Sequence, residues 1–81
     1  MSAIRIGVDC QFEADGTLRV RRIFAGGRWL AVEQGRQWQD HLGRHALIIH
    51  PEGGARQIRL RPDTMTWEMR PAGAGRETQL V

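Results

Sequence analysis

Residues 4–12 read Ile-Arg-Ile-Gly-Val-Asp-Cys-Gln-Phe, with an apolar side chain at every second position from Ile4 to Phe12. The residues between them are polar or glycine. Alternation with a period of two is typical of a β-strand that buries one face. A turn sequence, Asp15-Gly16, and a second alternating run over residues 17–21 follow directly. This part of the chain therefore predicts a β-hairpin and an all-β fold, and it leaves the function open.

The alternation also predicts how the first hairpin pairs, because cross-strand partners in an antiparallel ladder share a face. A three-residue loop over residues 14–16, with Gly16 in the left-handed conformation, keeps the apolar residues together. It pairs Phe12 with Leu18 and Cys10 with Val20. On the outer face, the same register pairs Asp9 with Arg21 and Gln11 with Arg19.

The doubled arginine Arg21-Arg22 interrupts the second run. A β-bulge at this point returns Ile23 to the inner face and bends the strand, as a small curled sheet requires. Gly26-Gly27 then predicts a tight hairpin loop. Pairing across that loop places Ile23 with Leu30 inside and Phe24 with Trp29 on the outer side.

The segment 33–43 is ambiguous between an extended strand end and a loop with one irregular helical turn. The second is preferred, because Trp38 and Leu42 are four residues apart and Gly43 suits a helix cap. Residues 45–50 form an apolar run that is typical of a central strand covered on both faces.

A two-residue loop at Pro62-Asp63 organises the last predicted hairpin. It pairs Leu60 with Met65 and Ile58 with Trp67. It places Arg59 and Arg61 outside, beside Thr66 and Thr64, and Gln57 opposite Glu68.

These elements predict a single small antiparallel meander of five to six strands, with at most one helical turn near 36–42. We expect it to curl into an SH3-like barrel or half-barrel, because a flat sheet of this size leaves one face wet. The domain spans residues 1–70. Residues 71–81 are small and polar, and they predict a flexible tail.

Composition limits the function classes. The 81 residues suffice for one domain, and the net charge is +3. All twelve basic residues are arginine, which we attribute to codon bias, so that only their placement can indicate function. The single cysteine, Cys10, lies in the buried phase and is expected to be a core residue. With no leader and no long apolar run, we expect a bacterial cytoplasmic protein that does not contact a membrane.

Two outward-facing groups are candidate binding residues. Phe24 and Trp29, flanked by Arg22 and Arg28, have the aromatic and basic character of surfaces that hold nucleic acid or a partner peptide. The alternative is that the pair packs under the Trp38 segment as a second core. The other group consists of Arg19, Arg21, Arg59 and Arg61. These arginines could form a basic stripe that follows a phosphate backbone. The alternative is an ordinary solvated face.

Metal binding and catalysis are not expected. His45 and His50 are an odd number of residues apart and point to opposite faces of a strand, and Gly43 interrupts a helical alignment of His41 with His45. The only serine is Ser2, and no nucleophile, base and acid can be assembled. We therefore predict no catalytic residues, no metal site, no cofactor and no enzymatic activity.

Residues 23–29 read Ile-Phe-Ala-Gly-Gly-Arg-Trp and are followed by Val32-Glu33, Trp38 and a late Trp67-Glu68-Met69. This order resembles a family of small bacterial β domains of unknown function associated with damage-inducible mutagenesis polymerase genes. The family's hairpin reads roughly W-x-G-R-x-Y/W-x-V-x-E, and here Phe24 replaces its first aromatic residue. The resemblance covers about half of the chain and implies a DNA-repair setting and a binding role.

The sequence thus predicts a non-catalytic binding module whose partner is nucleic acid or an acidic protein surface. The alternative is a structural or protein-interaction subunit, such as a homodimer formed through a strand edge. The oligomeric state stays open at this point.

Overall fold

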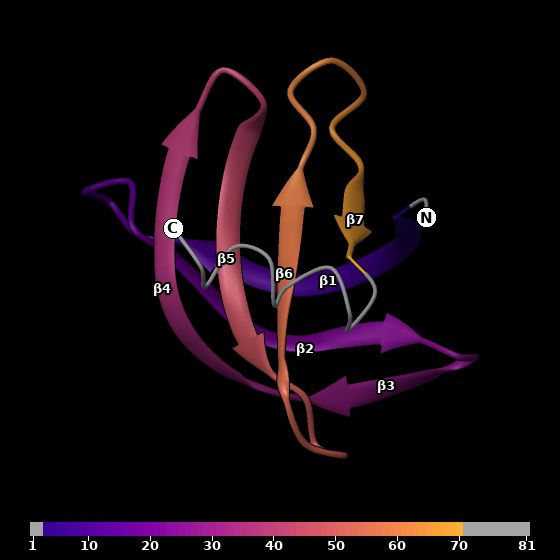
Figure 1. The fold of residues 1–81 in the computed structure, drawn as a ribbon. Coiled ribbons are helices and arrows are strands. Elements are labelled where there is room, and N and C mark those ends of the chain that lie inside the picture. Colours follow the sequence, from indigo (N-terminus) through magenta and orange to yellow (C-terminus); the bar gives the residue numbers. More distant parts are fainter. Residues whose placement is uncertain (1–2, 71–81) are drawn as a thin grey trace.

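The computed structural model describes residues 3–70, which contain seven β-strands and no helix. They are β1 (Ile4–Phe12), β2 (Leu18–Ala25), β3 (Arg28–Ala31), β4 (Glu33–Asp40), β5 (Gly43–Ile49), β6 (Ala55–Leu60) and β7 (Trp67–Met69). All pairings are antiparallel, in the order β3-β2-β1-β7-β6-β5-β4. The sheet curls into a half-barrel, with β4 to β7 side by side and β1 to β3 crossing behind them (Figure 1).

The predicted all-β, SH3-like barrel or half-barrel is confirmed, with seven strands where five to six were expected. The predicted tail, residues 71–81, lies outside the described residues. No helix within residues 3–70 has the length and apolar character needed to span a bilayer.

Two corners curl the sheet. The long strand β1 pairs with β7 through residues 4–6 and with β2 through residues 7–12. The other corner is Val32, between β3 and β4: β3 pairs with β2, whereas β4 pairs with β5. Val32 still donates its amide hydrogen to the Arg21 carbonyl at 3.1 Å, so the chain leaves β2 only after this residue.

Four predicted cross-strand pairs of the first two hairpins are confirmed, three on the inner face and one, Phe24–Trp29, on the outer face. Phe12 pairs with Leu18, Cys10 with Val20, Ile23 with Leu30 and Phe24 with Trp29. The predicted bulge is also present, because Cys10 pairs with Val20 while the preceding Asp9 pairs with Arg22. Arg21 is the extra residue, so the expected pairing of Asp9 with Arg21 was wrong by one position.

The core lies between the two halves of the curled sheet. Its buried apolar residues are Ile6, Leu18, Val20, Ile23, Ala46, Ile48, Ile58 and Met69. Cys10 packs against them half-buried, as expected from its phase in β1. Burial raises the pKa of the Cys10 thiol, and the neighbouring Asp9 raises it further. A raised thiol pKa lowers the thiolate fraction and with it the reactivity.

The segment 33–43 is mainly strand β4, and the expected loop with a helical turn was wrong. The reason is a contact that the sequence pattern does not show: Gln34 and Gln37 turn inward and bind the edge of β2. The Gln34 side chain accepts from the Val20 amide at 2.6 Å, and the Gln37 side chain accepts from the Leu18 amide at 3.0 Å. Both amide nitrogens donate to the Leu18 carbonyl, at 2.8 and 2.7 Å.

These four hydrogen bonds form what we call the amide seam, which joins β2 to β4. They satisfy backbone groups of β2 at the point where β3 no longer pairs with it. Side-chain amides thus take the place of ladder hydrogen bonds between the two halves of the sheet.

The last hairpin differs from its predicted register by two residues. Ile58 pairs with Met69 and Leu60 with Trp67, whereas Met65 lies in a longer connection with a φ of 58°. Ile58, Leu60 and Trp67 still share a face, because a shift of two preserves the alternation. Met65, expected inside, is 68% exposed instead. Glu68 therefore faces Arg59, so the expected pairings of Glu68 with Gln57 and of Arg59 with Thr66 were wrong. Gln57 is buried, and its carbonyl accepts from the Arg70 amide at 2.9 Å.

Residues 45–50 were expected to form a central strand covered on both faces, but β5 is next to the last strand of the sheet, between β6 and β4. It is also not covered on both faces along its whole length. Ala46 and Ile48 are fully buried, whereas Ile49 is 47% exposed at the end of the barrel. Gly43 begins the strand with a φ of 133°, and a Cβ there would collide with the Leu60 carbonyl oxygen. The close packing of β5 on β6 thus requires glycine at this position.

Candidate binding surface

Phe24 and Trp29 form an exposed aromatic pair on the outer face of the β2–β3 hairpin. Their ring centroids lie 5.3 Å apart in an edge-to-face arrangement, with 64° between the ring planes. Phe24 is 41% exposed and Trp29 is 46% exposed, whereas the adjacent Ile23 is completely buried. The bulge at Arg21 restores this alternation, so it directs both rings away from the core.

Gly7 on β1 supports the pair from below. It is the cross-strand partner of Phe24. A Cβ at this position would lie 3.2 Å from the Phe24 Cβ and 3.8 Å from the Trp29 ring. The absence of a side chain at Gly7 therefore lets the indole approach the sheet closely, as aromatic residues do beside strand glycines.

Arg22 borders the aromatic pair on one side. Its guanidinium lies 5.0 Å from the centroid of the Trp29 ring, within the range of cation–π contacts. Its Nε also donates to the Asp9 carboxylate at 3.0 Å. The arginine is thus held across the indole by a carboxylate from β1.

Arg28 was expected to flank the pair, but it lies on the opposite face of β3 from Trp29, because neighbouring residues of a strand alternate between faces. There it lines a hollow with Leu30 and contacts Glu52 at 3.3 Å. Both side chains of this ion pair are about two-thirds exposed, at 66% and 69%. Exposed ion pairs of this kind contribute only about 0–1 kcal/mol, because water and salt screen them. An incoming anion can therefore replace Glu52 at little cost.

Trp38 does not cover the aromatic pair, so the expected second core under that segment is not formed. Its ring stacks instead on His45, with centroids 5.0 Å apart and 6° between the planes. The guanidinium of Arg36 lies 4.8 Å from the centroid of the Trp38 ring, so this tryptophan has its own arginine neighbour on β4.

His45 is buried and has hydrogen-bond partners on both ring nitrogens. Its Nε2 lies 2.8 Å from the Asp40 carboxylate, and its Nδ1 lies 3.2 Å from the Gln57 amide nitrogen. The hydrogen bond with His45 lowers the pKa of Asp40. Within residues 3–70, no three side chains of the metal-binding types gather into one group.

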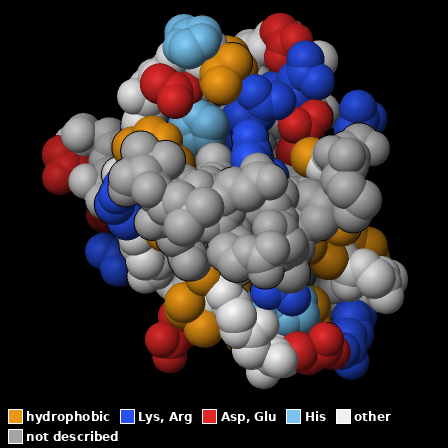
Figure 2. Space-filling view, viewed as in Figure 1, with side chains coloured by type: hydrophobic (Ala, Val, Ile, Leu, Met, Phe, Trp, Pro, Cys, Tyr) orange, Lys and Arg blue, Asp and Glu red, His pale blue; other side chains and the backbone are white. Residues whose placement is uncertain are grey.

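The four arginines predicted as a basic stripe do not lie side by side. Arg19 and Arg21 are on β2, whereas Arg59 is on β6 and Arg61 follows it, with β1 and β7 between these strands. Each arginine also has a polar partner: Glu13 at 3.4 Å, Gln11 at 3.1 Å, Glu68 at 2.9 Å and Asp63 at 2.7 Å, respectively. Figure 2 shows acidic side chains among the basic ones on the visible face.

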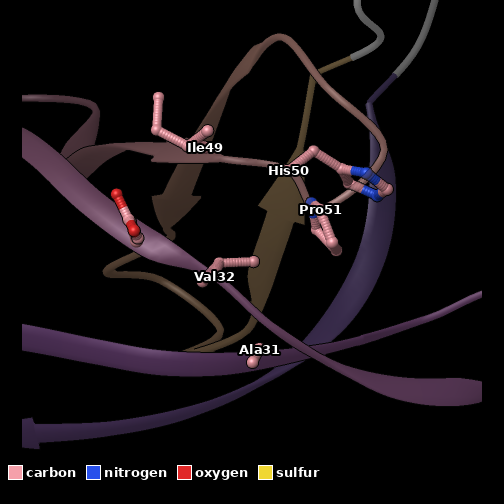
Figure 3. Close-up of a pocket in the computed structure, with 6 residues that line it drawn as sticks. Ala31, Val32, Ile49, His50 and Pro51 are labelled. Atoms are coloured by element: carbon pink, nitrogen blue, oxygen red, sulfur yellow. The ribbon is translucent and has the colours of Figure 1, made fainter.

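Two open hollows lie at the end of the barrel near β3. One, of about 400 Å³, is lined by Ala31, Val32, Glu33, Ile49, His50 and Pro51. In Figure 3, Ala31 and Val32 lie on one side of it, with His50 and Pro51 across from them. The other, of about 490 Å³, shares His50 and reaches Arg28 and Glu52. The β5–β6 turn therefore stands apart from β3 and leaves space between them.

Sequence reasoning located the aromatic pair and Arg22, placed Arg28 on the wrong face, and missed three further residues. Gly7 could have been found as a glycine in the outward phase, opposite Phe24. Asp9 was expected to pair with Arg21 rather than Arg22, and only the exact position of the bulge decides between these two partners. Glu52 reaches Arg28 across the fold, and no local sequence signal predicts such a contact.

No protein-family model matches the chain, and no curated protein or solved structure is similar enough to count as a match. The resemblance described from residues 21–69 therefore stays a prediction.

Proposed function

We propose that the chain is a non-catalytic binding module that holds single-stranded nucleic acid on the outer face of β2 and β3. The observation that supports this most strongly is the exposed Phe24–Trp29 pair with Arg22 across the indole. Unpaired bases stack on exposed aromatic rings, and neighbouring arginines contact the phosphates.

The arrangement of side chains on β2 supports a path for the bound nucleic-acid strand. Arg19, Arg21 and Arg22 precede Phe24 on the same strand, and all four are exposed. A base stacked on Trp29 would place the adjoining phosphates over this basic part of β2. Arg59 and Arg61 belong to the other half of the sheet and bind Glu68, so the proposal does not require them.

The proposal is tested by titrating a labelled oligothymidylate and a labelled duplex with the protein at two salt concentrations. We expect the single strand to bind more tightly, because its bases are free to stack. Affinity should fall roughly 20-fold between about 50 and about 200 mM salt if some three phosphates are neutralised. Absence of binding at the lower salt concentration would refute the proposal.

Trp29→Ala should weaken binding about 5- to 150-fold, since stacking of one base contributes roughly 1–3 kcal/mol. The matched control is Trp38→Ala, which removes the other arginine-flanked tryptophan and should leave the affinity unchanged. Equal losses in both variants would contradict a site at Trp29. Equally strong binding of polyglutamate would instead indicate an acidic protein surface as the partner.

A second function, as a protein-interaction subunit, is favoured by one specific observation. Strand β3 ends the sheet, and none of the strands in the described range pairs with its outer edge. The resemblance noted for residues 21–69 supports the first function, because it implies a DNA-repair setting.

A further inference from the structure

The outer edge of β3 carries backbone groups that point away from the sheet. A two-residue loop, Gly26-Gly27, joins β2 to β3, so the flanking pair Ala25–Arg28 is hydrogen-bonded. Ladder alternation then directs the amide and carbonyl groups of Trp29 and Ala31 away from β2. Among residues 3–70, no strand pairs with these groups.

This edge has few of the features that normally prevent pairing with another chain. Natural edge strands are protected by proline, lysine, a bulge or an inward-pointing charge. The sequence of β3, Arg-Trp-Leu-Ala, has no proline or lysine, and its pairing with β2 is regular. Its protection consists of its short length and of the charge of Arg28 at its first position.

We infer that β3 pairs antiparallel with the β3 strand of a second copy of this chain, around a two-fold axis at Leu30. In this register, Trp29 exchanges backbone hydrogen bonds with the partner's Ala31, and Ala31 does so with the partner's Trp29. Leu30 lies opposite the partner's Leu30, in a pair that is not hydrogen-bonded.

Size and charge along the strand support a second copy as the occupant. The large Trp29 lies opposite the small Ala31 of the partner subunit, so each indole covers a small residue, as it also covers Gly7. Arg28 then lies opposite the partner's Val32 and one residue from the partner's Glu33, so the charges that approach each other at each end of the paired segment are unlike. The ion pair of Arg28 with Glu52 is exposed and yields readily to this contact.

The dimer would place two aromatic surfaces on one continuous outer face, because a two-fold axis perpendicular to the sheet keeps both outer faces on the same side. Trp29 and the partner's Trp29 then lie diagonally across the axis. This inference does not rest on nucleic-acid binding, since the pairing uses the strand edge rather than the ring faces.

Light scattering across a concentration series tests the dimer without any ligand. We expect twice the 9.2 kDa chain mass to appear at concentrations on the order of 100 μM, because so short a strand pair buries less surface than a standard interface. Ala31→Pro removes the outward amide and should leave a monomer. Ala31→Val keeps that amide and should retain the dimer.

Thermal unfolding of both variants shows whether Ala31→Pro stays folded, and a mixed-label sample tests the wild type directly. In that sample, an isotope-filtered NOE should join the Leu30 Hα atoms of the two copies. A monomer at every concentration, or a dimer without this NOE, would overturn the inference. A wild-type chain that stays monomeric but still binds oligothymidylate would overturn it while leaving the proposed function standing.

Discussion

Arg21 shows how one inserted residue determines what a small barrel presents to solvent. Without an extra residue in β2, the alternation set by Leu18 and Val20 would bring Phe24 inward and turn Ile23 to solvent. With it, Ile23 is completely buried and Phe24 is exposed. The arginine can occupy the bulge because its own side chain reaches solvent and binds Gln11.

Glu68 is the residue from which we expect a clear pH effect on stability. Hydrogen bonds from Arg59 and then Arg61 hold the pKa of its carboxyl below the ordinary value. The unfolded chain therefore binds a proton on this group at a higher pH than the folded chain does. The resulting stabilisation is present above the unfolded-state pKa and is lost as pH falls through the folded-state pKa.

We expect Glu68→Gln to reduce the loss of stability on acidification below about pH 4.5, as followed by urea unfolding at several pH values. Glu33→Gln is the control, because Glu33 is exposed and forms no ion pair with any residue from 3 to 70. An unchanged pH dependence in Glu68→Gln would show that the two arginines do not favour the charged carboxylate.

At the scale of the elements, the amide seam is the least regular contact of the fold. Strands elsewhere in the sheet exchange backbone hydrogen bonds, whereas β2 and β4 are joined through two glutamine side chains. Gln34 satisfies the amide of Val20, a residue only 5% exposed. Breaking this bond leaves a buried donor without a partner, which costs more than losing a bond in water.

Gln34→Ala should therefore lower the free energy of unfolding by about 1–3 kcal/mol. Amide exchange at Val20 should become faster. The control is Gln39→Ala on the same strand, whose exposed side chain accepts a hydrogen bond from Arg44, and it should cost less than about 0.5 kcal/mol. Equal stability of wild type and Gln34→Ala, in urea unfolding, would mean that water replaces the amide without loss.

At the scale of the whole molecule, the sequence predicts what alternation and turn chemistry determine. The first two hairpins were predicted correctly because their apolar phase permits only one register, and the doubled arginine located the bulge. Strand β4 could not be predicted, because its inward residues are glutamines whose partners lie on β2. The last register failed because Leu60 has apolar candidates at both Met65 and Trp67.

The candidate surface divides in the same way. Local alternation predicted the outward aromatic pair, whereas the order of strands decided that Arg19 and Arg21 lie apart from Arg59 and Arg61. Strand order depends on how β1 pairs with β7, and no residue pattern in either segment specifies that neighbour. Placement of charges across a sheet therefore needs the topology as well as the phase.

The central claim is that the bulge exposes Phe24 and Trp29 as a contact surface for single-stranded nucleic acid. Its most direct test is an NMR titration of isotope-labelled protein with an oligothymidylate. We predict that the largest shift changes occur at the Trp29 indole N–H, the Phe24 ring and the Arg22 Nε. Changes centred on Arg59 and Arg61 instead, or binding that leaves the Trp29 indole unmoved, would contradict the account.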